Sequence, residues 1–247
     1  MEPNNSHINV NFADFFPLLD TAYHEFSHIE FKIFSYYFTT LVHTKGERNR
    51  EVIIPDSELK KYFGTNPVEK EYLTKVFSHL LGASVDVPVY PYPSYDVRDQ
   101  VERCYFVKIF EAVSFVLEKN GKWIVRLECT ESIWNHFFKG KDLEYILYLI
   151  NGTANLKIGY SYDLFKYLEE NRNVGVWVTT VDDFRHMLGC DQSKTYGKFK
   201  NFNNLVLKKI KSELMENTDC KFLMEYIKSG RNIVAIRISM NVLTYKR

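Results

Sequence analysis

Helix-forming segments precede a pair of extended segments in each half of this 247-residue sequence, and this order predicts an α+β fold of two tandem winged-helix domains. The composition is that of a folded protein, because 45% of the residues are hydrophobic and 26% are charged, which excludes a disordered chain. Residue identity between the halves is weak, so the architecture repeats rather than the sequence. The predicted parts are an N-terminal extension over 1–17, a first winged-helix domain over 18–139 and a second over 140–247.

The first half opens on a capped helix. Ser27-His28-Ile29-Glu30 is a capping box of the form S-x-x-E, which predicts the start of a long buried helix running to Val42. Asn120-Gly121 predicts a tight hairpin turn between two strands. The other elements expected here are a strand over 52–54, helices over 56–64 and 67–81, and extended segments over 85–90, 104–110, 114–117 and 123–129.

The second half repeats this order. Thr180 caps a predicted helix that Gly189 ends, and a longer helix is expected from about Ser193 to Glu216. The remaining expected elements are helices over 142–150 and 161–171, a short strand over 177–178, and closing strands over 222–227 and 233–240, joined by a tip over 228–231.

The charge of the chain is divided unevenly between its halves. Residues 1–140 carry 15 Lys and Arg against 19 Asp and Glu, whereas residues 141–247 carry 17 against 12. The strongest local feature is the interval 194–211, which has six lysines and no acidic residue. This asymmetry indicates an anionic partner for the second half.

Placed on a helix, the basic interval separates into two faces. One face carries Tyr196, Phe199, Asn203, Val206, Ile210 and Leu214, and apart from Asn203 it is predicted to enter the core. The opposite face carries Lys194, Gly197, Lys198, Asn201, Asn204, Lys208 and Lys211. Lysine neutralises phosphate and asparagine can bond the edge of adenine, so this face predicts DNA contact, with Asn201 reading a base. The alternative is a lysine face that meets only solvent.

The hairpin tip adds two more cations. Lys228 and Arg231 lie where a wing would contact the adjacent minor groove or phosphates. The complete set of candidate DNA-binding residues is Lys194, Thr195, Tyr196, Lys198, Lys200, Asn201, Asn204, Lys208, Lys228, Arg231 and Asn232.

Four blocks of the second half resemble a known family. They are Tyr-Ser-Tyr-Asp-Leu-Phe-Lys-Tyr-Leu at 160–168, Trp177 with Val-Asp-Asp-Phe-Arg-His-Met-Leu-Gly at 181–189, Tyr-Gly-Lys-Phe-Lys at 196–200 continuing to Val206-Leu207 and Glu213, and Glu-Tyr-Ile-Lys-Ser-Gly-Arg at 225–231. In identity and spacing they are similar to the plasmid replication initiator family, the iteron-binding winged-helix initiators of RepA/RepB/RepE type. The first half resembles the family's first domain more loosely, through residues 27–33 and the helix pair over 53–81.

The resemblance implies a plasmid DNA replication initiator that binds repeated sequences, iterons, in double-stranded origin DNA. It implies that the second domain is the main DNA-binding domain, and that the first domain mediates dimerisation and makes auxiliary DNA contacts. The implied partners are a second copy, as a homodimer in equilibrium with a DNA-binding monomer, and the host replication initiator and replicative helicase. Two features depart from the family: Asn203-Asn204 stands where relatives often carry basic residues, and Glu69 and Glu71 flank Lys70 in the first domain.

One motif points toward an enzyme instead. His24-Glu25-Phe26-Ser27-His28 satisfies H-E-x-x-H, the zinc metalloprotease pattern, which needs both histidines on one helical face. If Ser27 caps a helix, His24 and Glu25 precede that helix and the geometry is lost. No P-loop, no G-x-S-x-G and no His-hydrophobe-His pair occurs in the sequence. We therefore expect no catalytic residue, no metal and no cofactor.

The remaining sequence features concern location and alternatives. No apolar run reaches the length of a membrane span and the N-terminus lacks the apolar core of a signal peptide, so a cytoplasmic protein without a membrane partner is expected. The four scattered cysteines are expected to be free thiols. A winged-helix transcriptional regulator without initiation activity remains the alternative function, since it would need the same groove-reading surface.

Overall fold

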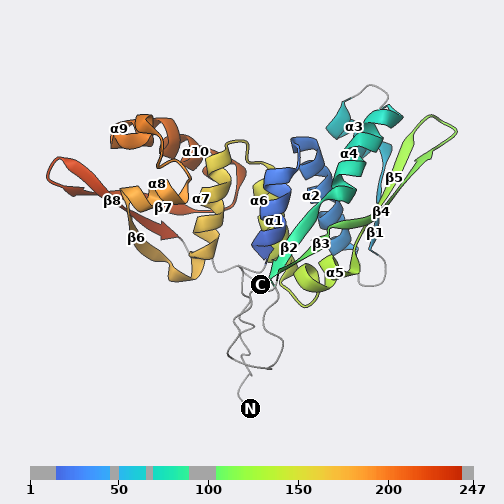
Figure 1. Cartoon of the computed structure of the whole chain (residues 1–247), viewed down its shortest axis with the longest axis horizontal. Coiled ribbons are helices and arrows are strands. Elements are labelled where there is room, and N and C mark those ends of the chain that lie inside the picture. Colours follow the sequence, from blue (N-terminus) through green and yellow to red (C-terminus); the bar gives the residue numbers. More distant parts are fainter. Residues whose placement is uncertain (1–14, 45–49, 65–68, 89–103, 241–247) are drawn as a thin grey trace, which may run out of the picture. The chain divides into compact units, whose positions relative to one another are not determined.

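The computed structural model describes residues 15–44, 50–64, 69–88 and 104–240, and it divides the chain into two compact units, 1–150 and 151–247 (Figure 1). The division falls within α6 (Leu143–Ala154) rather than at the predicted junction of 139 and 140. At the predicted junction, a turn at Gly140 with φ of 71° leads almost directly into α6, so no flexible linker stands between the two predicted domains. Most of a helix that the sequence assigned to the second domain thus belongs to the first unit.

The first unit contains the predicted helices and strands and two elements that the sequence did not predict. Its elements are α1 (Phe16–Glu25), α2 (His28–His43), β1 (Glu51–Ile54), α3 (Asp56–Phe63), α4 (Lys70–Gly82), β2 (Ser84–Pro88), β3 (Cys104–Lys108), β4 (Phe110–Leu117), β5 (Trp123–Cys129), α5 (Glu131–Ile133) and the π-helical turn η2 (Trp134–Phe138). The unpredicted elements are α1 and the α5–η2 segment. Because α1 begins at Phe16, the N-terminal extension is shorter than predicted, and the expected start of α4 at Pro67 lies outside the described residues.

Antiparallel pairing builds two small sheets in this unit. One has the strand order β1-β5-β4 and the other pairs β2 with β3. The predicted Asn-Gly turn joins β4 to β5: Gly121 adopts φ of 78°, and the Glu118 amide donates to the Lys122 carbonyl at 2.9 Å. Glycine is favoured there because this positive φ is costly for residues with a side chain.

The capping box at the start of α2 is confirmed. The Ser27 hydroxyl accepts from the Glu30 amide at 3.3 Å, and the Glu30 carboxylate accepts from the Ser27 amide at 2.7 Å. Since α1 ends at Glu25, His24 and His28 lie on different helices. The two histidines therefore do not share the helical face that zinc binding would need.

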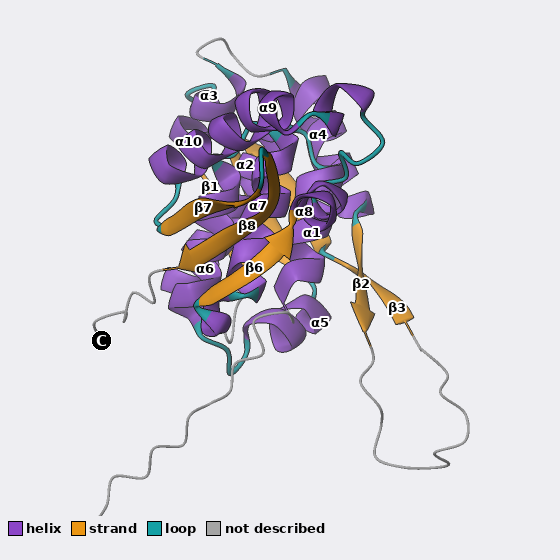
Figure 2. Ribbon diagram, turned by 90° about the vertical axis from the view of Figure 1, so that its left-hand side faces the viewer, coloured by secondary structure: helices purple, strands orange, loops and turns teal. Residues whose placement is uncertain are grey.

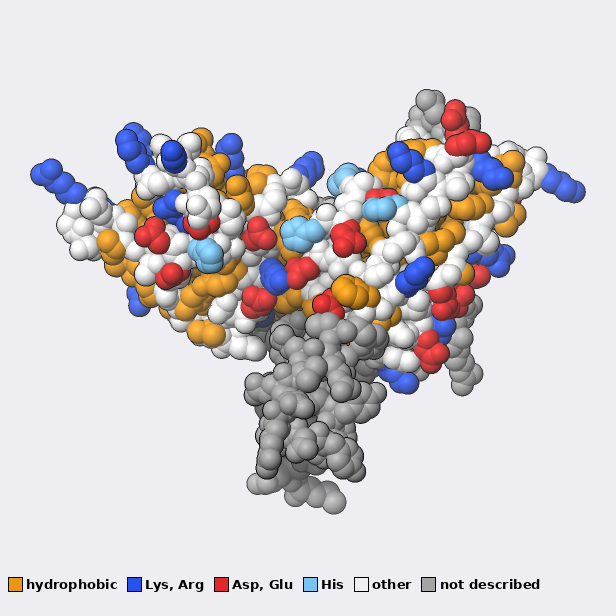
Figure 3. All heavy atoms as spheres, in the orientation of Figure 1, with side chains coloured by type: hydrophobic (Ala, Val, Ile, Leu, Met, Phe, Trp, Pro, Cys, Tyr) orange, Lys and Arg blue, Asp and Glu red, His pale blue; other side chains and the backbone are white. Residues whose placement is uncertain are grey.

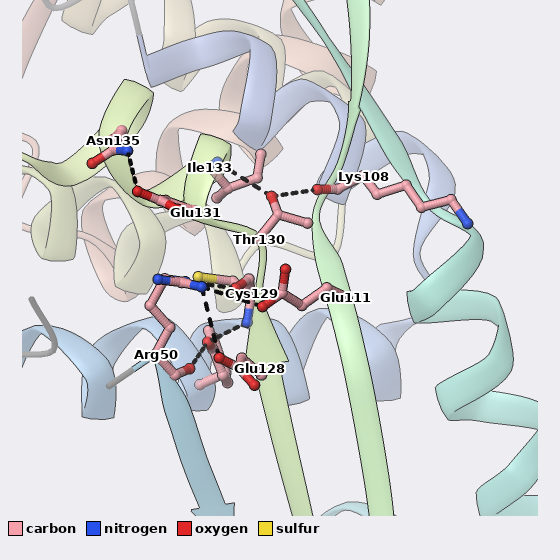
Figure 4. Close-up of polar contacts among 10 residues, drawn as sticks. Arg50, Lys108, Glu111, Glu128, Cys129, Thr130, Glu131, Ile133 and Asn135 are labelled. Carbon is pink, nitrogen blue, oxygen red and sulfur yellow. Dashed lines mark hydrogen bonds and ion pairs between the residues drawn. The ribbon is translucent and has the colours of Figure 1, made fainter. Parts of the chain in front are cut away.

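A partly buried polar cluster joins α2 to the first sheet (Figure 4). The Tyr37 hydroxyl donates to the Arg50 carbonyl and accepts from the Cys129 amide at 2.7 Å. The Arg50 side chain donates to the Cys129 carbonyl at 3.0 Å and to Glu111 at 3.2 Å. These bonds satisfy backbone groups at the ends of β1 and β5, which would otherwise be unpaired in the core.

Burial also fixes the state of the cysteines. Desolvation raises the pKa of Cys129 to about 12, so its thiol stays protonated at neutral pH. Cys129, Cys190 and Cys220 are buried and form no disulfide among the described residues, as the sequence predicted, and the side chain of Cys104 lies outside the described part of the chain.

The second unit follows the same plan of helices and a three-stranded sheet. After the end of α6, its elements are α7 (Gly159–Glu170), the 3-10 turn η3 (Arg172–Val174), β6 (Val176–Thr180), α8 (Val181–Met187), the 3-10 turn η4 (Lys194–Gly197), α9 (Phe199–Phe202), the π-helical turn η5 (Asn203–Leu207), α10 (Lys208–Asn217), β7 (Phe222–Ser229) and β8 (Asn232–Met240). The strand order is β6-β8-β7, all antiparallel, and Figure 2 shows these strands side by side below α9 and α10. Thr180 caps α8 as predicted, with its hydroxyl accepting from the Asp183 amide at 3.0 Å.

No helix in the described ranges combines the length and the apolarity that a bilayer crossing requires.

Candidate nucleic-acid interface

The long basic helix predicted from 193 to 216 is not continuous. Residues 194–197 form the 3-10 turn η4, Lys198 is extended with φ of −87° and ψ of 123°, and α9 begins only at Phe199. The Lys198 carbonyl accepts from the amides of Asn201 and Phe202 at 3.0 and 3.1 Å, so Lys198 stands at the N-cap of the helix. Gly197 just before it lowers the helix propensity of the segment by about 1 kcal/mol relative to alanine.

The interruption changes which side chains enter the core. Phe202 is fully buried, whereas Phe199 and Tyr196 are only half-buried, so the predicted core face was wrong at its N-terminal end. The π-helical turn η5 adds to this change, because its wider turn advances the face of the helix by one residue. The side chains that fill the core are those of Phe202, Val206, Leu207, Ile210 and Leu214.

The lysines of the segment remain on the surface. Lys194, Lys198, Lys200 and Lys208 are exposed, and so are Thr195 and Asn204. Figure 3 shows the Lys and Arg side chains gathered over α9 and α10 and at the tip of the β7–β8 hairpin. None of these lysines forms an ion pair with another described residue. They can therefore meet the phosphates of a nucleic acid without first breaking an internal pair.

The acidic residue that follows the lysines is already engaged. The Glu213 carboxylate accepts from the backbone amides of Lys157 and Ile158, at 2.9 and 3.1 Å. These bonds tie α10 to the start of α7, at the end of the helix that lies away from Lys198. The other carboxylate of α10, Glu216, accepts from the Ser212 hydroxyl at 2.6 Å, and neither glutamate forms an ion pair with a described lysine of the segment.

The hairpin tip has the form of a wing. Ser229 pairs with Asn232 across the turn, and Gly230 takes φ of 61° to close it. Lys228, Arg231 and Asn232 are exposed and are free of ion pairs within the described structure. The tip is thus a compact cationic loop carried by two paired strands.

Asn201 has a structural partner that the sequence did not reveal. Its side-chain amide donates to the Thr195 carbonyl at 3.1 Å, which fastens η4 to α9. The second N–H and the carbonyl oxygen of this amide keep their capacity to bond a base edge.

We expect Asn201→Ala to weaken binding to the specific site by about 1–3 kcal/mol, with nonspecific binding and its salt dependence nearly unchanged. Titrations of the variant and the parent on a specific and a random duplex measure both effects. An equal loss on the two duplexes would instead assign the amide to holding the turn that carries Lys194 and Lys198, or to a phosphate.

Sequence reasoning missed one residue of this surface, Tyr226 on β7. Its ring contacts Phe199 edge-on, with 5.0 Å between ring centroids, and its hydroxyl donates to the Asn203 side chain at 2.7 Å. Alternation along the strand from the buried Phe222 and Met224 could have placed Tyr226 on the helix-facing side of the sheet. Its two partners could not have been predicted, because both were assigned to the core face of a continuous helix.

The corresponding surface of the first unit has mixed charge. Lys70 and Lys75 on α4 are exposed, but so are Glu69 and Glu71 at its start. Lys119 and Lys122 are exposed at the β4–β5 turn. This surface offers a nucleic acid a weaker positive potential than the second unit does.

The fold and the basic surface together define a DNA-binding protein built from two winged-helix domains. Two family models match the chain, that of the initiator replication protein WH1 domain over residues 17–169 and that of the initiator Rep protein WH2 domain over residues 180–240. The chain therefore belongs to the family of plasmid replication initiators.

No curated protein matches it. Among solved structures, it is similar to a crystal structure of domains 2 and 3 of RctB, with 8% identity over 85% of this chain and 80% of that one and a TM-score of 0.48.

The two family matches confirm the predicted fold class and the predicted family. The protein is a plasmid replication initiator that binds DNA, and nothing favours the alternative of a transcriptional regulator. The WH1 match continues through α6 and α7, well past the predicted junction at 139.

Proposed function

We propose that the second unit reads iterons, the repeated duplex sites of a plasmid origin. In this proposal α9, η5 and the start of α10 enter the major groove, and the β7–β8 tip lies on the neighbouring phosphates or minor groove. The observation that carries it is a row of exposed, unpaired lysines from Lys194 to Lys208, next to a cationic wing that contains Arg231.

The lysine and the asparagine side chains of the segment have different tasks in this arrangement. Lysines contribute charge that any duplex would satisfy, so Lys194, Lys198, Lys200 and Lys208 would set affinity and register. Asn201 and Asn204 offer amides that can bond base edges, so they would contribute sequence preference. Thr195, Tyr196 and Asn232 lie beside these groups and can bond phosphate oxygens.

The number of bound copies tests iteron reading directly. On a fragment from the origin with n direct repeats, we expect up to n retarded complexes to appear in succession as the protein concentration rises. A fragment of equal length with the repeats scrambled should show only the smear of nonspecific binding. A single complex irrespective of repeat number would contradict the proposal.

We propose that the first unit holds two copies together in a homodimer that dissociates into the DNA-binding monomer. Support comes from Phe106 on β3, whose side chain is 75% exposed in a sheet of only two strands. Among the described residues this sheet has open edges, whose backbone N–H and C=O groups can pair with a second chain, and the Phe106 ring would add apolar area to that contact.

Sedimentation tests this dimer. We expect a concentration-dependent mass between one and two copies for the full chain, and a shift toward monomer in Phe106→Ser. A full chain that stays monomeric at high micromolar concentration would contradict the proposal.

The chain would then act by binding rather than by catalysis, in the cytoplasm, and would recruit the host replication initiator and the replicative helicase to the origin. The broken H-E-x-x-H geometry supports a role without zinc chemistry, since Ser27 caps α2 between the two histidines. Across the part of the chain that the structure describes, no group of three His, Cys, Asp or Glu residues is placed to hold a metal ion.

A further inference from the structure

Tyr226 links the wing hairpin to the helical segment that carries the exposed lysines. It lies on β7, two residues before Lys228, on the side of the strand that faces the helices. Its hydroxyl donates to the Asn203 carboxamide oxygen at 2.7 Å, and its ring packs edge-on against Phe199 at 5.0 Å. Phe199 is the first residue of α9, and Asn203 is the first residue of η5.

The place of these two contacts on the helix matters. Asn203 lies four positions after Phe199, so one tyrosine touches both ends of the first helical turn. This turn carries Lys200 and Asn201, and Lys198 precedes it. A π-helical turn follows at once and separates α9 from α10, so the orientation of the first turn is not set by α10 alone.

The chemistry of the tyrosine suits a fixed contact. Burial raises the pKa of Tyr226, so the hydroxyl remains protonated and can donate at physiological pH. Phe199 and Tyr226 are both partly exposed, so the contact is at the surface of the unit and adds little to its core. Loss of such a surface contact should change the orientation of the first turn of α9 more than it changes the stability of the unit.

We propose that Tyr226 is a positioning residue for sequence reading, which sets the angle of the first turn of α9 against the wing through Asn203 and Phe199. The inference rests on the proposed function, because it assumes that this turn faces the bases. Tyr226 holds the amides of the turn in register with the base edges while Lys228 and Arg231 hold the phosphates. Nonspecific binding needs only the charges and does not depend on this angle.

The test is a double-mutant cycle on two duplexes. One duplex is selected from a random-sequence library by the wild-type protein, and the other is a scrambled duplex of equal length and composition. Tyr226→Phe removes the hydroxyl and keeps the ring, and Asn203→Ala removes its acceptor. We expect each variant to weaken binding to the selected duplex about three- to tenfold, the net worth of one hydrogen bond, with binding to the scrambled duplex unchanged. The double variant should be no weaker than either single one, because both remove the same bond.

Tyr167→Phe is the matched control. It removes a tyrosine hydroxyl that accepts from the Trp177 indole at 2.9 Å, between α7 and β6 of the same unit. It should lower the melting temperature and leave both affinities unchanged.

Four results would overturn the proposal: wild-type affinity of Tyr226→Phe for the selected duplex, additive losses in the double variant, an equal loss in Tyr167→Phe, or a parallel loss on the scrambled duplex. Lys208→Ala separates this inference from the function on which it rests. If Lys208→Ala weakens binding to both duplexes while the Tyr226 variant has no effect, the inference fails and the proposed function stands. If Lys208→Ala weakens neither, the helix does not meet DNA and the proposed function fails.

Discussion

Simultaneous replacement of Lys198 and Lys208 with alanine should weaken DNA binding on every sequence and flatten its dependence on salt. Both side chains are exposed and free of ion pairs within the described structure, one at the N-cap of α9 and one at the start of α10. Each phosphate contact contributes a slope of about −0.9 to the plot of log K against log salt, so the slope should fall in magnitude by about two. The ratio of wild-type to variant affinity should accordingly shrink about tenfold between 50 and 200 mM salt.

The matched control for this variant is Lys221→Ala. Lys221 is exposed and directly precedes β7, at the end of the strand opposite the wing tip. Its loss should leave the salt slope unchanged. An unchanged slope in the Lys198/Lys208 variant as well would show that neither side chain meets phosphate.

The largest loss of stability is expected for Phe38→Ala in the first unit. The Phe38 ring is fully buried and stacks on Phe138 at 4.7 Å with 6° between the ring planes, and it also contacts Phe34 at 4.8 Å. Removing the ring leaves a cavity between α2 and η2, so we expect a loss of about 3–5 kcal/mol in the free energy of unfolding. Urea unfolding followed by fluorescence and circular dichroism measures the change.

Phe38→Leu provides the comparison for this prediction. Leucine keeps much of the volume and should cost clearly less than alanine does. A loss below about 1 kcal/mol in Phe38→Ala would contradict the buried aromatic cluster of the first unit.

The parts of the fold that local chemistry determines could be predicted from the sequence. Ser27 and Thr180 cap helices where a hydroxyl can accept from an amide three residues on, and Asn120-Gly121 turns a hairpin because glycine tolerates its positive φ. Each of these signals lies within a few residues, so it needs no knowledge of tertiary structure. Helix α1 lacks a side-chain capping bond at its N-cap Phe15, and its local signal is Pro17 in the first turn, which the prediction missed.

The details of the candidate site depend on contacts between distant residues, and the sequence could not predict them. Lys198 favours helix, yet it is extended, because the Asn201 amide bonds the Thr195 carbonyl and Phe202 fills the core instead of Phe199. Tyr226 reaches Asn203 across 23 positions of sequence. The exposed lysines and the wing were predicted nonetheless, because an acid-free basic interval stays on the surface whatever the exact start of the helix.

Hydroxyl-radical footprinting of the wild-type protein on the origin of its own replicon tests the central claim most directly. A winged-helix reader whose helix enters the major groove and whose wing lies beside it should protect each direct repeat on one face of the duplex, with the same pattern in every repeat. Lys228→Ala/Arg231→Ala should remove the outer part of that pattern and keep the part beneath the helix. Protection that ignores the repeats, or that covers the whole fragment evenly, would contradict the account.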